Sequence, residues 1–162
     1  MWATHFPSPL GRLRLVCTEQ ALVGVYFPDH APPPAHQAED GAHPLLDAAA
    51  TQLAEWFDAR RTQFELPLAH TGTPFQQTVW TALRSIDHGQ TTTYGALAMR
   101  LGRPSAARAI GAAVGRNPLS IIVPCHRVMG RGGRLTGYAG GLWRKRWLLA
   151  HESSGGLLFE QR

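Results

Sequence analysis

The first part of the chain alternates between apolar and polar positions with the period of a β-strand. This alternation runs through residues 2–27 and predicts an antiparallel meander. From His43 to Ala59 the apolar residues recur at helical spacing, which predicts an amphipathic helix covering the sheet. The proline-rich stretch 28–41 between them predicts a surface loop, and Phe64 and Leu66 indicate one more short strand.

The pattern changes after residues 67–74, which lack periodicity and contain both glycine and proline. We therefore expect a domain boundary here, with an α/β domain over 1–70 and a mostly α-helical domain over 71–162. An apolar stripe from Phe75 to Ile86 predicts the first helix of the second domain. The last helix is expected from Leu142 to Glu152.

Two short helices with a tight turn between them predict a helix-turn-helix. The run Thr91-Thr92-Thr93 supplies an N-cap for the first helix, Gly102 ends it, and Arg103-Pro104 is expected to open the second. Residues 105–114 of the second helix are almost all small, and only Arg108 has a long side chain. Such a helix suits close approach to a backbone or a shallow groove, although small residues also pack one helix against another.

The most reactive-looking segment is the apolar run 121–128, which contains Cys125 and His126. The β-branched residues predict a strand, and Pro124 is expected to end it just before the cysteine. A thiol beside an imidazole is a nucleophile and a base. The alternative is that Cys125 is a small buried hydrophobe and His126 a hydrogen-bonded core residue.

Further polar residues lie on either side of this segment. Asn117 sits in a turn that joins the helix-turn-helix to the predicted strand. The glycine-rich stretch 130–141 allows a ligand to approach the backbone, with Tyr138 as its one large aromatic residue. Glu152, near the end of the last helix, either points inward or is solvated.

The composition of the chain limits the partners and the cellular location that we expect. Sixteen Lys and Arg residues against 11 Asp and Glu give a net charge of +5, mostly from arginine, which suits a phosphate-containing partner. Two cysteines cannot form a disulfide framework or a four-thiolate zinc site. The N-terminus lacks signal-peptide features and no apolar run is long enough to cross a membrane, so we expect a soluble cytoplasmic protein.

Several separated stretches together resemble one family, the methylated-DNA–protein-cysteine (O6-alkylguanine) methyltransferases. The resemblance covers Thr73 to Glu152 in order and spacing, and the first half more loosely. The matching stretches are Phe75-Gln76-Gln77-Thr78-Val79-Trp80, Thr93-Tyr94-Gly95, Ala107-Arg108-Ala109-Ile110-Gly111, Asn117-Pro118, Pro124-Cys125-His126-Arg127-Val128, Gly137-Tyr138 and Leu148-Leu149-Ala150-His151-Glu152. The resemblance implies a ribonuclease-H-like first domain, and the lone Cys17 of that domain argues against a structural zinc.

The resemblance also implies roles at the reactive centre. Cys125 would be the alkyl acceptor, activated by His126 and Glu152 through a bound water. The catalytic set it implies is Cys125, His126, Glu152, Asn117 and Tyr94, and the substrate-binding set is Tyr94, Val128, Tyr138 and Ala139. The Tyr94 hydroxyl and the Ala139 backbone N–H would stabilise the departing guanine. No metal or cofactor is implied.

The partner implied by the family is double-stranded DNA that contains O6-alkylguanine, bound in the minor groove largely without sequence specificity. Because a buried cysteine cannot reach a stacked base, the nucleotide must flip out, and Arg108 would fill the gap. The implied DNA-binding residues are Thr93, Tyr94, Arg103, Ala107, Arg108 and Arg131. We expect a monomer that acts once per molecule, since a thioether offers water no electrophilic centre.

Three other functions compete with this hypothesis. A relative that binds alkylguanine without repairing it would lack the reactive cysteine, and Cys125 is present. A Cys-His-Glu hydrolase would use the same triad but leaves Arg108 on a helix of small residues unexplained. A transcription regulator would need base-reading side chains on that helix.

Overall fold

The computed structural model describes residues 1–30 and 38–153. The chain divides into two compact units. The first consists of Met1–Thr71 together with the short segment Pro118–Ile122, and the second consists of Gly72–Asn117 and the residues from Val123 onward. The first unit thus contains five residues that lie far from the rest of it in the sequence.

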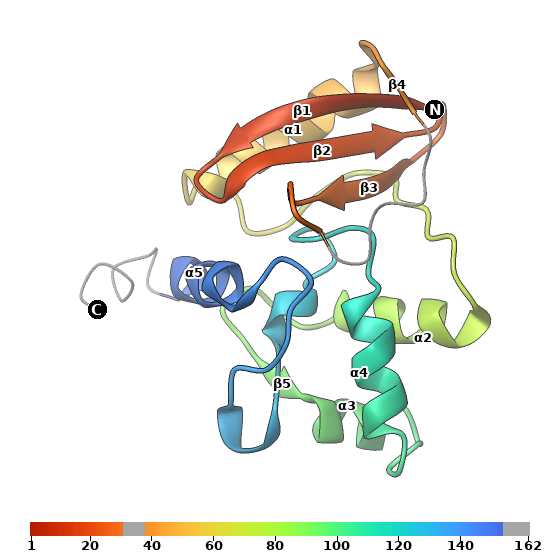
Figure 1. Cartoon of the computed structure of the whole chain (residues 1–162), viewed down its shortest axis with the longest axis vertical. Coiled ribbons are helices and arrows are strands. Elements are labelled where there is room, and N and C mark those ends of the chain that lie inside the picture. Colours follow the sequence, from red (N-terminus) through yellow and green to blue (C-terminus); the bar gives the residue numbers. More distant parts are fainter. Residues whose placement is uncertain (31–37, 154–162) are drawn as a thin grey trace. The chain divides into compact units, whose positions relative to one another are not determined.

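The first unit is built on a four-stranded sheet in the order β3-β2-β1-β4 (Figure 1). The strands β1 (Trp2–Ser8), β2 (Gly11–Cys17) and β3 (Leu22–Tyr26) form the predicted antiparallel meander. A two-residue loop joins β1 to β2, pairing Ser8 with Gly11, whose φ of 109° is one that glycine tolerates. The short strand β4 (Glu39–Asp40) runs parallel to β1.

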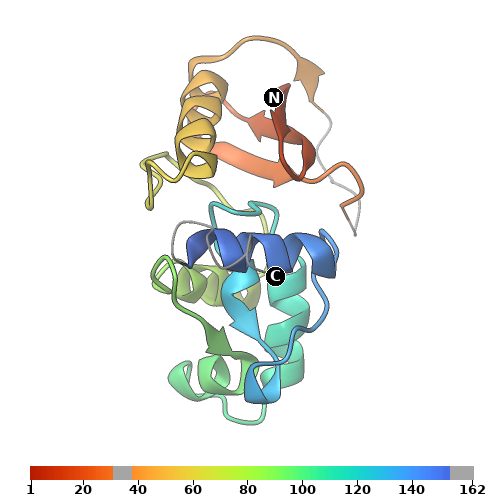
Figure 2. The same cartoon turned by 90° about the vertical axis from the view of Figure 1, so that its left-hand side faces the viewer.

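One helix, α1 (Pro44–Phe57), lies along a face of this sheet, as Figure 2 shows. It begins where the sequence predicted, because the His43 side chain caps it by accepting the backbone N–H of Leu45 at 3.1 Å. Its apolar stripe is buried with the inward side chains of β2 to form the core of the unit. The helix contributes Leu46, Ala49, Leu53 and Trp56, and β2 contributes Leu13 and Leu15.

Two local expectations for this unit were wrong. Phe64 and Leu66 form no strand; instead a single parallel bridge joins Leu68 to Leu22, with two backbone hydrogen bonds. The stretch 28–41 was predicted to be a surface loop throughout, but it contains the short strand β4 near its end. Residues 31–37 of that predicted loop, including the proline cluster, lie outside the described residues.

The second unit is mostly helical, with α2 (Pro74–Leu83), α3 (Tyr94–Arg100), α4 (Ala107–Gly115) and α5 (Leu142–Glu152). The predicted fold class, an α/β domain followed by a helical domain with a helix-turn-helix, is confirmed. Helix α2 begins with a capping box between Thr73 and Gln76 and stops at Leu83, three residues earlier than its apolar stripe predicted. A buried hydrogen bond of 2.8 Å from the Trp80 indole to the Ala113 carbonyl joins α2 to α4.

The helix-turn-helix differs from the prediction at the start of its second helix. The Thr93 hydroxyl caps α3 at 3.0 Å from the Ala96 nitrogen, and Gly102 ends that helix with a φ of 69°, both as predicted. Pro104, however, is not in the first turn of α4. Residues 103–106 close a separate turn, with the Ala106 N–H donating to the Arg103 carbonyl at 2.9 Å, so α4 starts only at Ala107.

The strand expected before Cys125 does not form. Leu119 makes one bridge to Val25 of β3, and the chain then turns twice. The Ile122 N–H donates to the Ser120 carbonyl around Ile121, whose φ is 72°, and the Cys125 N–H donates to the Val123 carbonyl around Pro124, both at 2.8 Å. These are two γ-turns, the first of the rare and strained kind, so burial and chain direction override strand propensity here.

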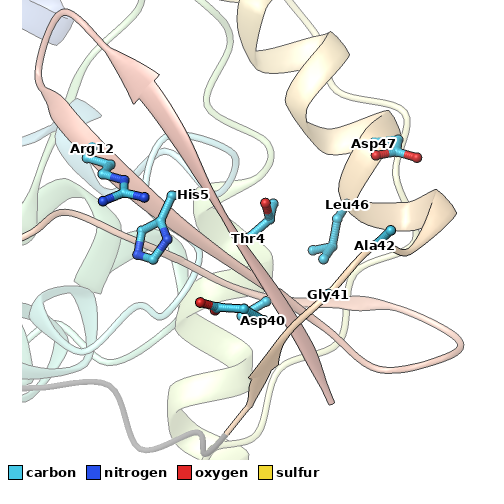
Figure 3. Close-up of a pocket in the computed structure, with 9 residues that line it drawn as sticks. Thr4, His5, Arg12, Asp40, Gly41, Ala42, Leu46 and Asp47 are labelled. Carbon is cyan, nitrogen blue, oxygen red and sulfur yellow. The ribbon is translucent and has the colours of Figure 1, made fainter.

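A pocket opens on the first unit, shown in Figure 3. It is lined by β1, the start of β2, β4 and the N-terminal turn of α1, with Thr4, His5, Arg12, Asp40 and Asp47 as its polar residues. None of the predicted site residues lines it. Within the described part of the chain, no helix combines the length and the hydrophobicity needed to cross a bilayer.

Candidate functional site

Cys125 lies in the second unit, at the start of the short 3₁₀ helix η1 (Cys125–Arg127). Only 4% of the residue is exposed. Asn117, also buried, fixes the turn before it by donating its side-chain N–H to the Val123 carbonyl at 2.8 Å. The same carbonyl accepts the backbone N–H of Cys125. Asn117 therefore holds the turn that places the thiol, as its position before the reactive segment indicated.

The surroundings of the thiol act on its ionisation in opposite directions. Burial raises the pKa of Cys125, because a thiolate is poorly solvated there. Hydrogen bonds from the Asn117 and Tyr138 side chains and the positive charge of Lys145 oppose this rise in pKa. The net direction is upward, so the resting protein holds a thiol that needs a base to become a nucleophile.

Lys145 is part of this site, and the sequence interpretation had placed it only on a basic helix. The residue is completely buried, and its ammonium donates to the Val128 carbonyl at 2.6 Å and to the Thr136 carbonyl at 3.5 Å. It also lies 6.0 Å from the centre of the Tyr94 ring. Burial lowers the pKa of Lys145, and the nearby Cys125 thiol acts against that shift.

His126 reaches the carboxylate of Glu152, with Nε2 and Oε2 3.0 Å apart. Glu152 points inward, since only 1% of its side chain is exposed. Arg127 binds both carboxylate oxygens, through Nε to Oε1 at 2.9 Å and Nη2 to Oε2 at 2.5 Å, and its Nη1 donates to the Ile86 carbonyl at 2.5 Å. Arg127 is therefore the second functional residue that the sequence interpretation missed.

The charge state of Glu152 follows from these contacts. Burial alone would raise the pKa of this carboxyl, but the charges and hydrogen bonds of His126 and Arg127 outweigh burial and hold the pKa well below its usual range. Glu152 is consequently ionised at neutral pH. An ionised, fixed carboxylate is the group that orients an imidazole as a base.

Two short strands bring Tyr94 to the same region. The strands β5 (Thr92–Thr93) and β6 (Val128–Met129) pair in parallel, so Tyr94, at the start of α3, follows directly on a residue that pairs with Met129. The Tyr94 ring packs near Gly111 of α4, and its hydroxyl lies 3.4 Å from the hydroxyl of Thr136. The structure thus brings Tyr94, Val128 and Lys145 together.

The glycine-rich segment after β6 forms the next part of the site. It contains the 3₁₀ turn η2 (Arg131–Gly133), and a turn closed by the Gly141 N–H and the Tyr138 carbonyl at 2.9 Å precedes α5. Tyr138 and Ala139 are half-buried in this turn. Arg144 anchors the loop to α5 by donating to the Gly140 carbonyl at 2.9 Å.

The predicted DNA-binding residues lie nearer the surface of the second unit. Arg108 on α4 is exposed, as are Arg103 and Arg131, while Ala107 and Thr93 are half-buried. Arg103 stacks over the Phe75 ring at 5.2 Å. The Thr93 hydroxyl is already used as the N-cap of α3.

Comparison with known proteins identifies the family. Residues 1–70 match the ribonuclease-like domain of 6-O-methylguanine DNA methyltransferase, and residues 74–154 match its DNA-binding domain. The chain belongs to this family. The family prediction made from the sequence is confirmed.

Individual relatives support this assignment over nearly the whole chain. The methylated-DNA–protein-cysteine methyltransferase of Haemophilus influenzae is 41% identical over 155 residues, covering 94% of this chain and 86% of that protein. The Shigella flexneri protein of the same name is 46% identical over 156 residues, covering 90% and 91%. The crystal structure of Mycobacterium tuberculosis OGT in complex with DNA superposes with a TM-score of 0.89 at 41% identity, covering 96% of this chain and 94% of that one.

Proposed function

We propose that this methyltransferase-family protein repairs O6-alkylguanine in double-stranded DNA by moving the alkyl group onto Cys125. The observation on which the proposal rests is a buried thiol beside the Lys145 ammonium, followed in the chain by a His126–Glu152–Arg127 network. The named activity of the relatives, methylated-DNA–protein-cysteine methyltransferase, is the one that this arrangement fits.

In the proposed reaction, His126 removes the proton of the Cys125 thiol. Nδ1 of His126 is buried and meets no hydrogen-bonding group in the described part of the chain, so a bridging water suits the transfer. Glu152, whose pKa is held low by His126 and Arg127, stabilises the imidazolium that results. The thiolate then attacks the alkyl carbon: the sulfur–carbon bond forms, the carbon–O6 bond breaks, and guanine leaves with the electron pair. Guanine takes up a proton from water, and His126 returns the thiol proton to water, so the protons balance.

The departing guanine needs hydrogen-bond donors and acceptors around it. We assign the donors to the Tyr94 hydroxyl and the Ala139 backbone N–H, and the acceptors for the exocyclic amine to the carbonyls of Cys125 and Val128. The Val128 carbonyl also accepts Lys145, and a carbonyl oxygen has two lone pairs, so it can accept both. Tyr138 would form one wall of the base pocket.

For DNA binding we propose that α4 enters the minor groove and that Arg108 fills the place of the flipped nucleotide. The exposed position of Arg108 on a helix of small residues supports this role. Thr93, Arg103, Ala107 and Arg131 would contact the backbone, which favours binding with little dependence on sequence. We further propose that the protein acts as a monomer in the cytoplasm.

The proposal predicts one repaired lesion per protein molecule, because the alkyl thioether on Cys125 offers water no electrophilic centre. The test mixes the protein with excess duplex DNA that contains labelled O6-methylguanine. Guanine should be restored only up to the protein concentration, and the peptide containing Cys125 should gain the mass of one methyl group. Multiple turnovers, or methyl on Cys17, would overturn the proposal.

A further inference from the structure

The carboxylate of Glu152 has a third partner that lies outside the relay described above. Nδ1 of His88 is 3.5 Å from Oε2 of Glu152, the same oxygen that lies 3.0 Å from His126 and accepts Arg127 at 2.5 Å. Three nitrogen atoms thus surround one oxygen, and the Arg127 guanidinium donates a hydrogen bond to it, whereas His88 interacts with it through charge. His88 is the most distant of the three, so its attraction to the oxygen depends on whether the imidazole carries a proton and a positive charge.

A tight turn after α2 places His88 at this position. The Gln90 N–H donates to the Asp87 carbonyl at 3.0 Å, and Gly89 has a φ of 81°, as the third residue of a type II turn requires. A Cβ at position 89 would lie 3.3 Å from the Glu152 carbonyl oxygen, so the turn packs directly against the end of α5. The turn therefore holds the backbone at His88 close to the end of α5.

The side chains of His88 and His126 differ in their exposure to solvent. The His126 side chain is completely buried, whereas 23% of the His88 side chain is exposed. Protons from solvent therefore reach His88 more readily than His126. His88 faces Glu152 and His151 from α5 and His126 and Arg127 from η1.

We propose that His88 is a positioning residue that slows alkyl transfer in acid: on gaining a proton it competes with His126 for Oε2 of Glu152. This inference rests on the proposed function of Cys125. A second positive charge beside the relay disfavours the imidazolium that His126 must become, so His126 is a weaker base while His88 is protonated. Neutral His88 leaves the relay undisturbed.

The electrostatic setting limits this effect to acidic solution. Burial lowers the pKa of His88; the Glu152 charge opposes this, and Arg127, His151 and His126 add to the lowering. The net direction is downward, so the proton is taken up below the usual histidine range.

The test measures the rate at which free O6-benzylguanine alkylates Cys125 between pH 5 and pH 8, since this small probe needs no DNA. The compared proteins are the wild type, His88→Gln, His88→Phe and a matched control, His5→Gln, whose histidine lies in the first unit. Neither Gln nor Phe can take up a proton. In both His88 variants the ratio of the rate at pH 8 to that at pH 5.5 should be about threefold to tenfold smaller than in the wild type. The upper limit is about tenfold because a change of one pH unit changes a protonation equilibrium tenfold.

The control variant should keep the wild-type ratio. A wild-type ratio in both His88 variants would overturn the role of His88 while leaving the proposed function intact. A wild-type protein in which Cys125 does not react at any pH would overturn both proposals. If neither His88 variant folds, the imidazole of His88 is titrated by NMR in the wild type and in Glu152→Gln; loss of the carboxylate should move its midpoint to lower pH, and an unmoved midpoint would refute the contact.

Discussion

Removal of the Arg127 guanidinium should destabilise the protein far more than removal of an exposed arginine. Arg127 makes two charge-assisted hydrogen bonds to Glu152 and a third to Ile86, with 8% of its side chain exposed. In Arg127→Met the Glu152 carboxylate keeps its burial but loses this partner. Breaking a buried ion pair from one side costs about 3–5 kcal/mol. For a chain of this size such a loss lowers the thermal midpoint by roughly 10 °C.

A double-mutant cycle isolates the interaction energy between Arg127 and Glu152 from their other contacts in the site. The free energy of unfolding would be measured by urea denaturation for Arg127→Met, Glu152→Gln and the double variant. Because the double variant buries no unpaired charge at this position, it should lose less than the sum of the single losses, with a coupling of about 2 kcal/mol. Arg60→Met is the matched control, since its ion pair with Asp58 is exposed and worth less than about 1 kcal/mol.

Two results would refute this reasoning. A loss in Arg127→Met no larger than that in the control would mean that the guanidinium does not offset the burial of Glu152. Additive losses around the cycle would mean that the two side chains stabilise the fold independently.

Three other predictions concern the same unit. Because the pKa of Glu152 is depressed in the fold, its contribution to stability should be complete above about pH 4.3 and lost as the pH falls further, so urea midpoints of wild type and Glu152→Gln should converge in acid. Lys145→Met should slow alkylation by O6-benzylguanine most at neutral pH and least at alkaline pH, where the Cys125 thiolate forms without help. Arg108→Ala should slow repair of duplex DNA more than reaction with O6-benzylguanine. The matched control is Arg116→Ala, on the exposed C-cap of α4, and it should change the rates on the two substrates to the same extent.

The regular elements could be predicted from the sequence because their determinants are local. The apolar alternation of β1 to β3 and the helical stripes of α1 and α5 lie within the elements themselves. The same holds for the caps at His43 and Thr93, although only the second was predicted. Local patterns of this kind are the ones that period and propensity capture.

Long-range contacts decided what the sequence interpretation missed. The β-branched run before Cys125 has strand propensity, but it forms two γ-turns, and Leu119 just before them bridges to Val25, far earlier in the chain. Arg127 and Lys145 looked like ordinary basic residues, and their partners lie 25 and 17 positions away. A charged residue gives no local sign that it will be buried, so the sequence could name the nucleophile and its base but not the cations beside them.

The return of Pro118–Ile122 to the first unit has a consequence for how the protein can be divided. Val25 donates its N–H to the Pro118 carbonyl and accepts the N–H of Ser120, so this segment is held by β3. A single cut at the linker would separate Pro118–Ile122 from the rest of the first unit, so the buried residue Leu119 would lose its partner Val25 of β3. The alkyl-acceptor half is therefore not a portable module, and protein engineers who wish to graft it elsewhere must carry β3 along or redesign these five residues.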